Sequence, residues 1–232
     1  MRKILWGMLL VAFLAAGNLV SGLLDGSGVG LPERIAPPEV ATAKEGYLIL
    51  AVSWTPSWCA AEGDARAAPR CAPGAGSGWL VHGLWPQHET GGWPEFCDTP
   101  HPAPRPELLE GMVDIMGAAG LAAHQWRKHG SCSGLEPAEY FARTRAAFAA
   151  LDFPAALDPA QAGQGHTPEA LRAAFRAANP AFGPDSLILT CRAGMAQELR
   201  VCLTHAGVPR ACDAGVLARG CTARHLTLPP IR

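Results

Sequence analysis

Apolar positions along the chain gather in short runs, separated by loops rich in Gly, Pro and Ala. The run YLILAVSW, from Tyr47 to Trp54, is mostly apolar and stops at Thr55-Pro56. A short apolar run bounded by turn residues predicts a buried strand. Three further runs predict strands: 78–84, which we expect to stop at Pro86 because proline interrupts a strand, 186–192 and 197–204.

The middle of the chain has helical spacing instead. Apolar residues recur on one side from Pro106 to near Gly120, and proline is favoured in the first turn of a helix. Thr167, followed by Pro168 and Glu169, predicts a capped helix start. Other helices are expected at 121–129, before Gly130, and at 136–151, and the last helix ends at Asn179-Pro180. Strands first, helices in the middle and strands last predict an α+β fold with an antiparallel central sheet and several helices.

The N-terminal segment is typical of an export signal. Arg2 and Lys3 precede the apolar run ILWGMLLVAFLAA at 4–16, which is short for a membrane-spanning helix. We expect a signal peptide over 1–22, although no A-x-A sequence marks the cleavage point, and an uncleaved membrane anchor is the alternative. Residues 23–44 lack periodicity and predict a flexible leader, followed by one domain over 45–232.

Composition narrows the class of protein. A hydrophobic fraction of 49% with 17% charged residues is typical of a globular domain. The formal net charge of −1 argues against a protein that coats nucleic acid by general electrostatic attraction, but not against an enzyme that binds a few phosphates. Only three of the 19 basic residues are Lys. Because Lys is rare in this chain, Lys128, which lies between two histidines, is a candidate for a chemical role.

The eight cysteines predict disulfides. An even number behind an export signal is typical of a disulfide framework. No two of them are separated by only two residues, so the spacing differs from that of a zinc site. The number of possible pairings is large, and spacing alone leaves them open. The cysteines are Cys59, Cys71, Cys97, Cys132, Cys191, Cys202, Cys212 and Cys221.

Two segments carry the candidate chemistry, 81–87 (VHGLWPQ) and 124–132 (HQWRKHGSC). On a helix, residues four apart share a face, so His124 lies beside Lys128 and Gln125 beside His129. Trp126 then points towards the core. The positive charge of Lys128 disfavours a bound metal, whereas imidazoles with an ammonium group suit a phosphate.

Histidines at a phosphate suit the cleavage of RNA, which carries its own nucleophile in the 2′-hydroxyl group. The reaction needs a base for the 2′-OH proton, an acid for the leaving 5′-oxygen and a cation for the charge on the phosphorane. Two imidazoles in opposite protonation states supply the base and the acid, and a lysine supplies the charge.

Both segments resemble the active-site segments of the ribonuclease T2 family, secreted endoribonucleases of broad base preference. HGLWP at 82–86 matches the first segment without a change, and HQWRKHGSC at 124–132 matches the second except at one position. That position is Gln125, where the family usually has Glu. YLILAVSW followed by Cys59 resembles the family's opening strand.

The resemblance implies roles for individual residues. His82 and His129 are the acid and base, with their order left open, and Lys128 stabilises the phosphorane beside Gln125. The residues implied to bind substrate are His124 for the phosphate, Trp85 for stacking on a base and Gln87 for the base edge. The implied disulfides are Cys59–Cys71, Cys97–Cys132, Cys191–Cys221 and Cys202–Cys212.

The implied function is cleavage of single-stranded RNA to 2′,3′-cyclic phosphate ends, which are then slowly hydrolysed to 3′-phosphates. We expect no metal or cofactor, no obligate protein partner, a monomer, and a secreted or periplasmic location in a bacterium. Because an amide cannot exchange a proton, Gln125 predicts activity that is reduced or shifted to lower pH. Two alternatives stay open: an inactive or weakened binding protein of the same fold, and a metalloenzyme that uses some of the eight histidines.

Overall fold

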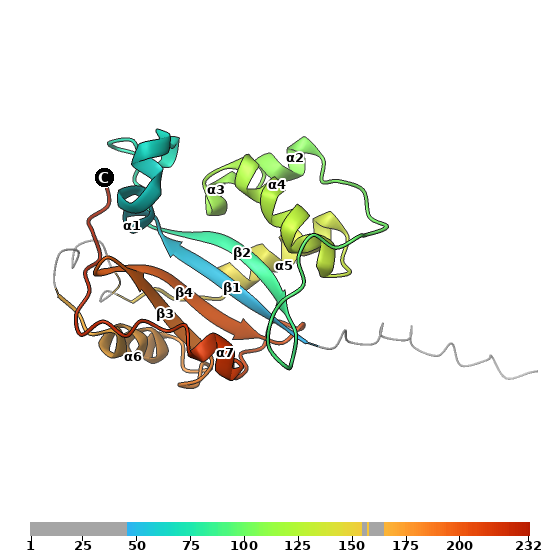
Figure 1. Cartoon of the computed structure of the whole chain (residues 1–232). Coiled ribbons are helices and arrows are strands. Elements are labelled where there is room, and N and C mark those ends of the chain that lie inside the picture. Colours follow the sequence, from blue (N-terminus) through green and yellow to red (C-terminus); the bar gives the residue numbers. More distant parts are fainter. Residues whose placement is uncertain (1–45, 155–156, 158–164) are drawn as a thin grey trace, which may run out of the picture. The chain divides into compact units, whose positions relative to one another are not determined.

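A four-stranded antiparallel sheet in the order β2-β1-β4-β3 organises the structure (Figure 1), a computed structural model that describes residues 46–154, 157 and 165–232. The α+β prediction is confirmed. The expected signal peptide and leader lie outside the described residues, and no described helix is long and apolar enough to cross a membrane. The strands are β1 (Tyr47–Trp54), β2 (Trp79–Gln87), β3 (Leu187–Arg192) and β4 (Met195–Leu203).

Helices α2 to α5 gather beside β2, and α6 lies near β3 at the opposite edge of the sheet (Figure 1). The Thr167 cap of α6 is confirmed, because its hydroxyl oxygen accepts a hydrogen bond from the Ala170 amide at 3.1 Å. The helices are α1 (Thr55–Trp58), α2 (Pro106–Glu110), α3 (Val113–Met116), α4 (Ala119–Lys128), α5 (Pro137–Ala149), α6 (Pro168–Ala178) and α7 (Ala214–Leu217), with short helical turns at Cys59–Gly63, Asp64–Arg66, Pro69–Cys71 and Gly130–Cys132.

The two faces of the sheet bury different sets of side chains, because neighbouring residues of a strand point to opposite sides. On β1, Leu48, Leu50 and Val52 belong to the large core beneath the helices, which also takes Trp126 of α4 as predicted. The opposite face carries a smaller apolar cluster, which includes Ile49. Polar side chains of β2 and β4 lie on this second face, where the candidate chemistry gathers.

Two regular elements differ clearly from the prediction, one in where it ends and the other in its continuity. Strand β2 continues through Pro86, which pairs with Leu48. Because β2 is an edge strand, its outer side needs no amide donor and tolerates proline. The helix expected from Pro106 to near Gly120 is broken into α2 and α3, and α3 ends at Gly117, whose φ of 76° suits only glycine well.

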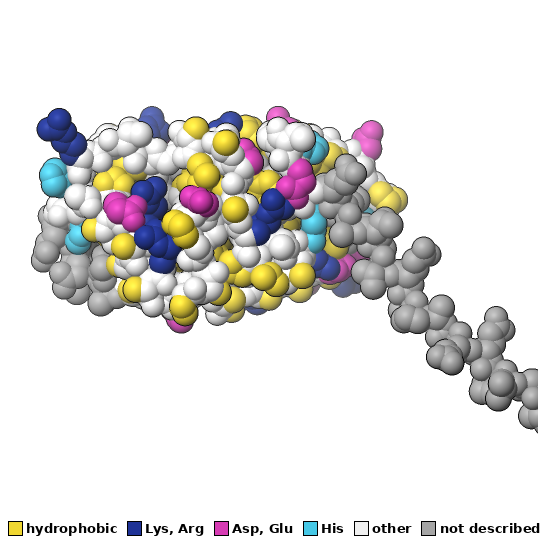
Figure 2. Space-filling model, turned by 90° about the horizontal axis from the view of Figure 1, so that it is seen from below, with side chains coloured by type: hydrophobic (Ala, Val, Ile, Leu, Met, Phe, Trp, Pro, Cys, Tyr) yellow, Lys and Arg dark blue, Asp and Glu magenta, His cyan; other side chains and the backbone are white. Residues whose placement is uncertain are grey.

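Basic side chains on the surface mostly lie beside acidic ones. Arg172 and Arg176 both bind Glu169, and Arg232 binds Asp64 at 2.6 Å. On the face that Figure 2 shows, Lys and Arg side chains form small groups next to Asp and Glu. Neighbouring carboxylates therefore offset much of the basic charge on the described surface.

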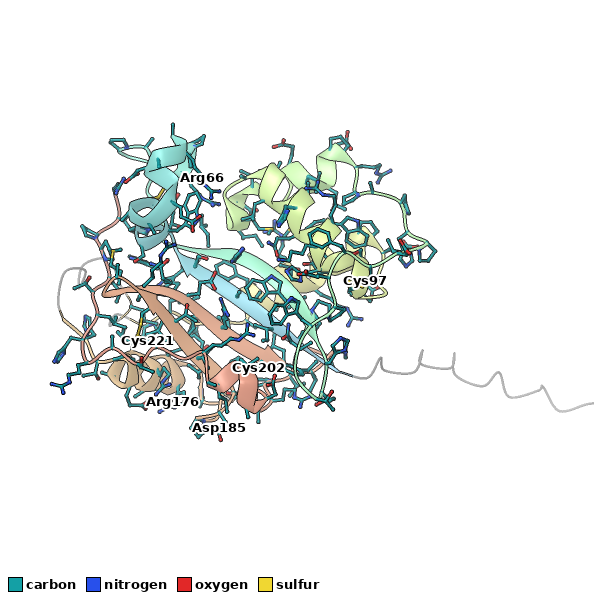
Figure 3. The ribbon with its side chains drawn as sticks, viewed as in Figure 1. Arg66, Cys97, Arg176, Asp185, Cys202 and Cys221 are labelled. Carbon is teal, nitrogen blue, oxygen red and sulfur yellow. A yellow bond between two sulfur atoms is a disulfide. The ribbon has the colours of Figure 1, made fainter. Side chains whose placement is uncertain are left out.

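All four predicted disulfides are confirmed: Cys59–Cys71, Cys97–Cys132, Cys191–Cys221 and Cys202–Cys212. In Figure 3, Cys97 lies on the loop beside helices α2 to α5, whereas Cys202 and Cys221 lie on the side of β3 and β4. The Cys97–Cys132 bridge therefore fastens the loop that follows β2 to the turn that follows α4.

Candidate active site

One cavity of about 290 Å³ brings together every residue that the sequence predicted for the site. Strand β2, helix α4 and the residue that directly follows α4 supply its predicted lining. The predicted residues in its wall are His82, Trp85, Gln87, His124, Gln125, Lys128 and His129.

His82 lies in a β-bulge. Ala51 of β1 pairs with Gly83 and Val52 pairs with Val81, so His82 is an extra residue without a partner across the strand pair. Bulges often lie beside functional sites, because the extra residue changes the direction of a side chain. Here the bulge keeps Val81 in the core while the His82 ring contacts the Trp85 ring on the site face, with centroids 5.2 Å apart.

A chain of polar contacts joins His82 to β4. Its Nδ1 lies 2.6 Å from Oε1 of Glu198, and Oε2 of Glu198 accepts from Nε and Nη2 of Arg200 at 2.9 and 2.6 Å. The guanidinium group of Arg200 also lies 5.1 Å from the Trp85 ring. Burial raises the pKa of Glu198, but the hydrogen bond and charge of His82, with those of Arg200, outweigh it and lower the pKa overall.

Helix α4 presents its side chains as its spacing predicted. Gln125 and Trp126 are buried, whereas His124 is exposed at the cavity. The helix ends at Lys128, and His129 leaves helical geometry while its amide still donates to the Gln125 carbonyl at 2.9 Å. The predicted boundary at 129 is therefore one residue too far.

Gly83 allows α4 to approach β2 closely. A Cβ atom at this position would lie 2.0 Å from Oε1 of Gln125 and 2.5 Å from Nε1 of Trp85. In the space left by the missing side chain, the Trp85 indole donates to Oε1 of Gln125 at 2.8 Å. Gln125 thus links helix and strand with its amide oxygen, a contact that a carboxylate at the same place would also make.

His129 lies in an environment that favours its neutral form. Burial, followed by the charges of Lys128 and His82, lowers the pKa of His129 from 6.5 to about 4. Its Nδ1 atom is buried and has no hydrogen-bond partner in the described structure. Burial also lowers the pKa of His124, with further contributions from the charges of Arg127 and Lys128.

The loop after β2 reaches Lys128. Nζ of Lys128 lies 3.4 Å from a carboxylate oxygen of Glu95, and the Lys128 carbonyl accepts from the Phe96 amide at 2.9 Å. The Cys97–Cys132 disulfide follows directly, so the loop is held at the C-terminal end of α4. Gln87 turns its amide nitrogen to the Pro86 carbonyl at 2.8 Å.

Sequence reasoning missed several residues of the cavity wall. Arg200 comes from β4, and Trp93, Asp213 and Arg219 come from loops and the start of α7. Glu198, also on β4 and also missed, contacts His82 but does not line this cavity. The available signal for Glu198 and Arg200 was a pair of charged residues inside the apolar strand run MAQELRVCL. A second cavity of about 490 Å³ adjoins the first, sharing His82, His124 and Arg200 with it. Among the described residues, no three His, Cys, Asp or Glu side chains group as metal ligands would.

A family model described as the ribonuclease T2 family matches residues 45–212. The chain belongs to the ribonuclease T2 family. A "Probable ribonuclease" of Haemophilus influenzae is 34% identical over 125 residues, which cover 49% of this chain and 46% of that protein. A "Ribonuclease" of Aeromonas hydrophila is 33% identical over 94 residues, 40% of each chain. The chain thus spans less than half the length of these curated relatives.

Solved structures share the fold of this family member. The RNase-related protein from Calystegia sepium superposes with a TM-score of 0.66 at 17% identity, covering 82% of this chain and 100% of that one. Trichomaglin, described as a novel S-like ribonuclease, superposes with a TM-score of 0.63 at 22% identity and the same coverage. At these identities the likeness shows the fold alone.

Proposed function

We propose that this protein is an endoribonuclease that cleaves single-stranded RNA and leaves 2′,3′-cyclic phosphate ends, which it then slowly hydrolyses to 3′-phosphates. The observation that carries the proposal is the convergence of His82, Lys128 and His129 in one cavity of a ribonuclease T2 family member. Two imidazoles and a cation around one phosphate supply all the groups that the reaction needs.

His129 is the base in this proposal. Its lowered pKa keeps the ring neutral at mildly acidic pH, so it can accept the 2′-hydroxyl proton. Because Nδ1 is buried, Nε2 is the nitrogen available for this proton. The 2′-oxygen then forms a bond to phosphorus, and the bond between phosphorus and the 5′-oxygen breaks.

His82 is the acid that gives a proton to the leaving 5′-oxygen. Its contact with Glu198 becomes an ion pair when the ring carries two protons, which suits a group that starts the reaction protonated. In the hydrolysis step the roles reverse, with a water molecule in the place of the 5′-hydroxyl group.

The remaining residues bind and stabilise. Lys128 offsets the negative charge that grows on the phosphorane, and His124 binds the phosphate as the ring at the junction of the two cavities. The roles of Trp85 in stacking on a base and of Gln87 at the base edge stay predictions. We also propose a secreted or periplasmic monomer, in keeping with the four disulfides.

The test is incubation of the purified, oxidised protein with single-stranded RNA at pH 5 to 7, with and without EDTA. Cyclic phosphate products that persist in EDTA are expected. His82→Ala and His129→Ala should each lower the rate by roughly 10²–10⁴-fold, the usual contribution of a general acid or base. His225→Ala is the matched control, because His225 is exposed and lies outside both cavities.

Two other results would overturn the proposal. RNA binding without any cleavage would identify a binding protein of the same fold, weakened by Gln125. Cleavage that EDTA abolishes would identify a metalloenzyme.

A further inference from the structure

Glu198 is a buried carboxylate in the middle of the sheet. It lies on β4, which has β1 on one side and β3 on the other, and its side chain is only 12% exposed. Charged side chains are rarely buried without a purpose or a partner. Glu198 has three partners, and one of them is His82.

We propose that Glu198 is a positioning residue for the reaction, which binds Nδ1 of His82 and so directs Nε2 of His82 to the substrate. The inference rests on the proposed function. It concerns a residue outside both sequence segments that predicted the site, and outside the seven residues assigned there.

The partners of Glu198 fix its carboxylate. Oε1 accepts from His82 Nδ1 at 2.6 Å and from the Ser53 hydroxyl at 3.1 Å, and Oε2 accepts from Arg200 twice. Arg200 also supplies the positive charge that makes burial of the carboxylate tolerable. A carboxylate held on both oxygens cannot rotate away from the imidazole, so the His82 ring has one preferred orientation.

This contact determines which nitrogen of His82 carries the mobile proton. An ionised carboxylate only accepts hydrogen bonds, so Nδ1 must keep its hydrogen in both protonation states of the ring. The second proton then sits on Nε2, the nitrogen that is not bound by Glu198. During cleavage that proton moves from Nε2 to the 5′-oxygen, and Nδ1 stays bonded to Glu198 throughout.

The sheet is built to allow the contact across β1. Neighbouring strands lie about 4.8 Å apart, so His82 on β2 and Glu198 on β4 must reach over the intervening strand. The two β1 residues nearest this contact are small: Ala51 pairs with Gly83 and Arg200, and Ser53 pairs with Glu198. A large side chain at either position would lie in the path between the imidazole and the carboxylate.

The test combines kinetics with nitrogen NMR of the histidine rings in the full disulfide-bonded protein. For the wild type, we expect neutral His82 to be protonated on Nδ1. Glu198→Ala should allow the Nε2-protonated form and should lower kcat by about 10²-fold or less, the usual effect of a misplaced reacting group, with KM nearly unchanged. Glu169→Ala is the control, because it removes an exposed carboxylate that lies outside both cavities, and it should leave both the tautomer and kcat close to wild type.

Glu198→Gln covers the case in which Glu198→Ala fails to fold because Arg200 loses its counterion. The amide oxygen still accepts from Nδ1, so the tautomer should persist while kcat falls for lack of the charge. An unchanged tautomer and kcat in Glu198→Ala would overturn the inference. So would neutral wild-type His82 protonated on Nε2, a result that depends on no variant and therefore holds if Glu198→Ala is unfolded. Absence of RNA cleavage by the wild type would instead overturn the proposed function, whereas the tautomer of wild-type His82 would still decide whether Glu198 orients the ring.

Discussion

The two catalytic histidines that we propose are the same side chain in opposite surroundings. His82, on the sheet side, is partly exposed and lies against the carboxylate of Glu198. His129, on the helix side, is buried beside Lys128, and its Nδ1 has no partner in the described structure. Negative charge stabilises an imidazolium ion, whereas burial among cations favours the neutral ring. In the proposed mechanism, these different surroundings suit the two rings to opposite proton transfers.

Lys128→Ala is the change that should disturb this comparison most. It removes the charge that we assign to the phosphorane and should lower kcat by roughly 10²–10³-fold, the range seen when one stabilising donor is lost. It also removes a cation that lowers the pKa of His129, so the acid limb of the pH profile should move to higher pH. Arg127→Ala is the control, because it removes one positive charge, as Lys128→Ala does, but from an exposed side chain. Similar losses in both variants would refute a specific role for Lys128.

Gly83→Ala should push apart β2 and α4, the two elements that carry the proposed site. The new Cβ would overlap Gln125 and Trp85, so α4 must move away from β2. We expect a loss of about 1–3 kcal/mol in the free energy of unfolding, with kcat lowered about tenfold or more because the histidines move apart. Gly120→Ala, on the same helix and facing open space, should be neutral or stabilising by up to about 1 kcal/mol. Urea unfolding and kcat of both variants check this, and a stable, fully active Gly83→Ala would contradict it.

His129 and Glu198 should affect the stability of the protein in two different pH ranges. Because the pKa of His129 falls from 6.5 to about 4 on folding, the unfolded state binds more protons between these values. Stability should therefore fall by roughly 2–3 kcal/mol as pH drops from 6.5 to 4. Glu198, with a pKa lowered from 4.5 to about 2, contributes a further loss below pH 4.5. Because the pKa of His124 is lowered as well, His129→Gln should reduce the first loss without abolishing it and should keep the second, while the exposed control His225→Gln keeps both.

Gln125→Glu should give the smallest effect. The carboxylate can still accept from the Trp85 indole, so the packing should persist. The added negative charge raises the pKa of His129, which moves the acid limb of the pH profile to higher pH, and the rate should rise a few-fold. A pH profile and rate identical to those of the wild type would mean that the residue at 125 serves only to join helix and strand.

Local sequence signals predicted much of this site, because each signal lies within one element. Helical spacing placed His124, Gln125 and Lys128 on the cavity side and Trp126 in the core. The disulfide pairing came from the family resemblance and not from spacing, and all four bridges are confirmed.

Features that depend on tertiary neighbours escaped prediction. Pro86 was expected to end β2, and only the sheet order shows that β2 is an edge strand where proline is tolerated. Glu198 was missed because its role depends on β4 lying two strands from β2, a pairing that no local pattern encodes. Arg219 joins the cavity from the C-terminal part of the chain, beside α7, whose four residues are too few for a periodic pattern.

Because His82 lies in a bulge, the pairing of β1 with β2 does not depend on the proposed acid. Every other residue of β2 pairs with β1, so deleting His82 would leave all remaining partners as they are. Deleting a residue next to Leu84 instead would turn one set of core side chains outward, because the faces of a strand alternate. His82 is therefore an insertion relative to the regular pairing of β1 with β2. A chain one residue shorter at this position should fold to the same ladder with no acid in its cavity, so loss or gain of the proposed acid takes a single codon.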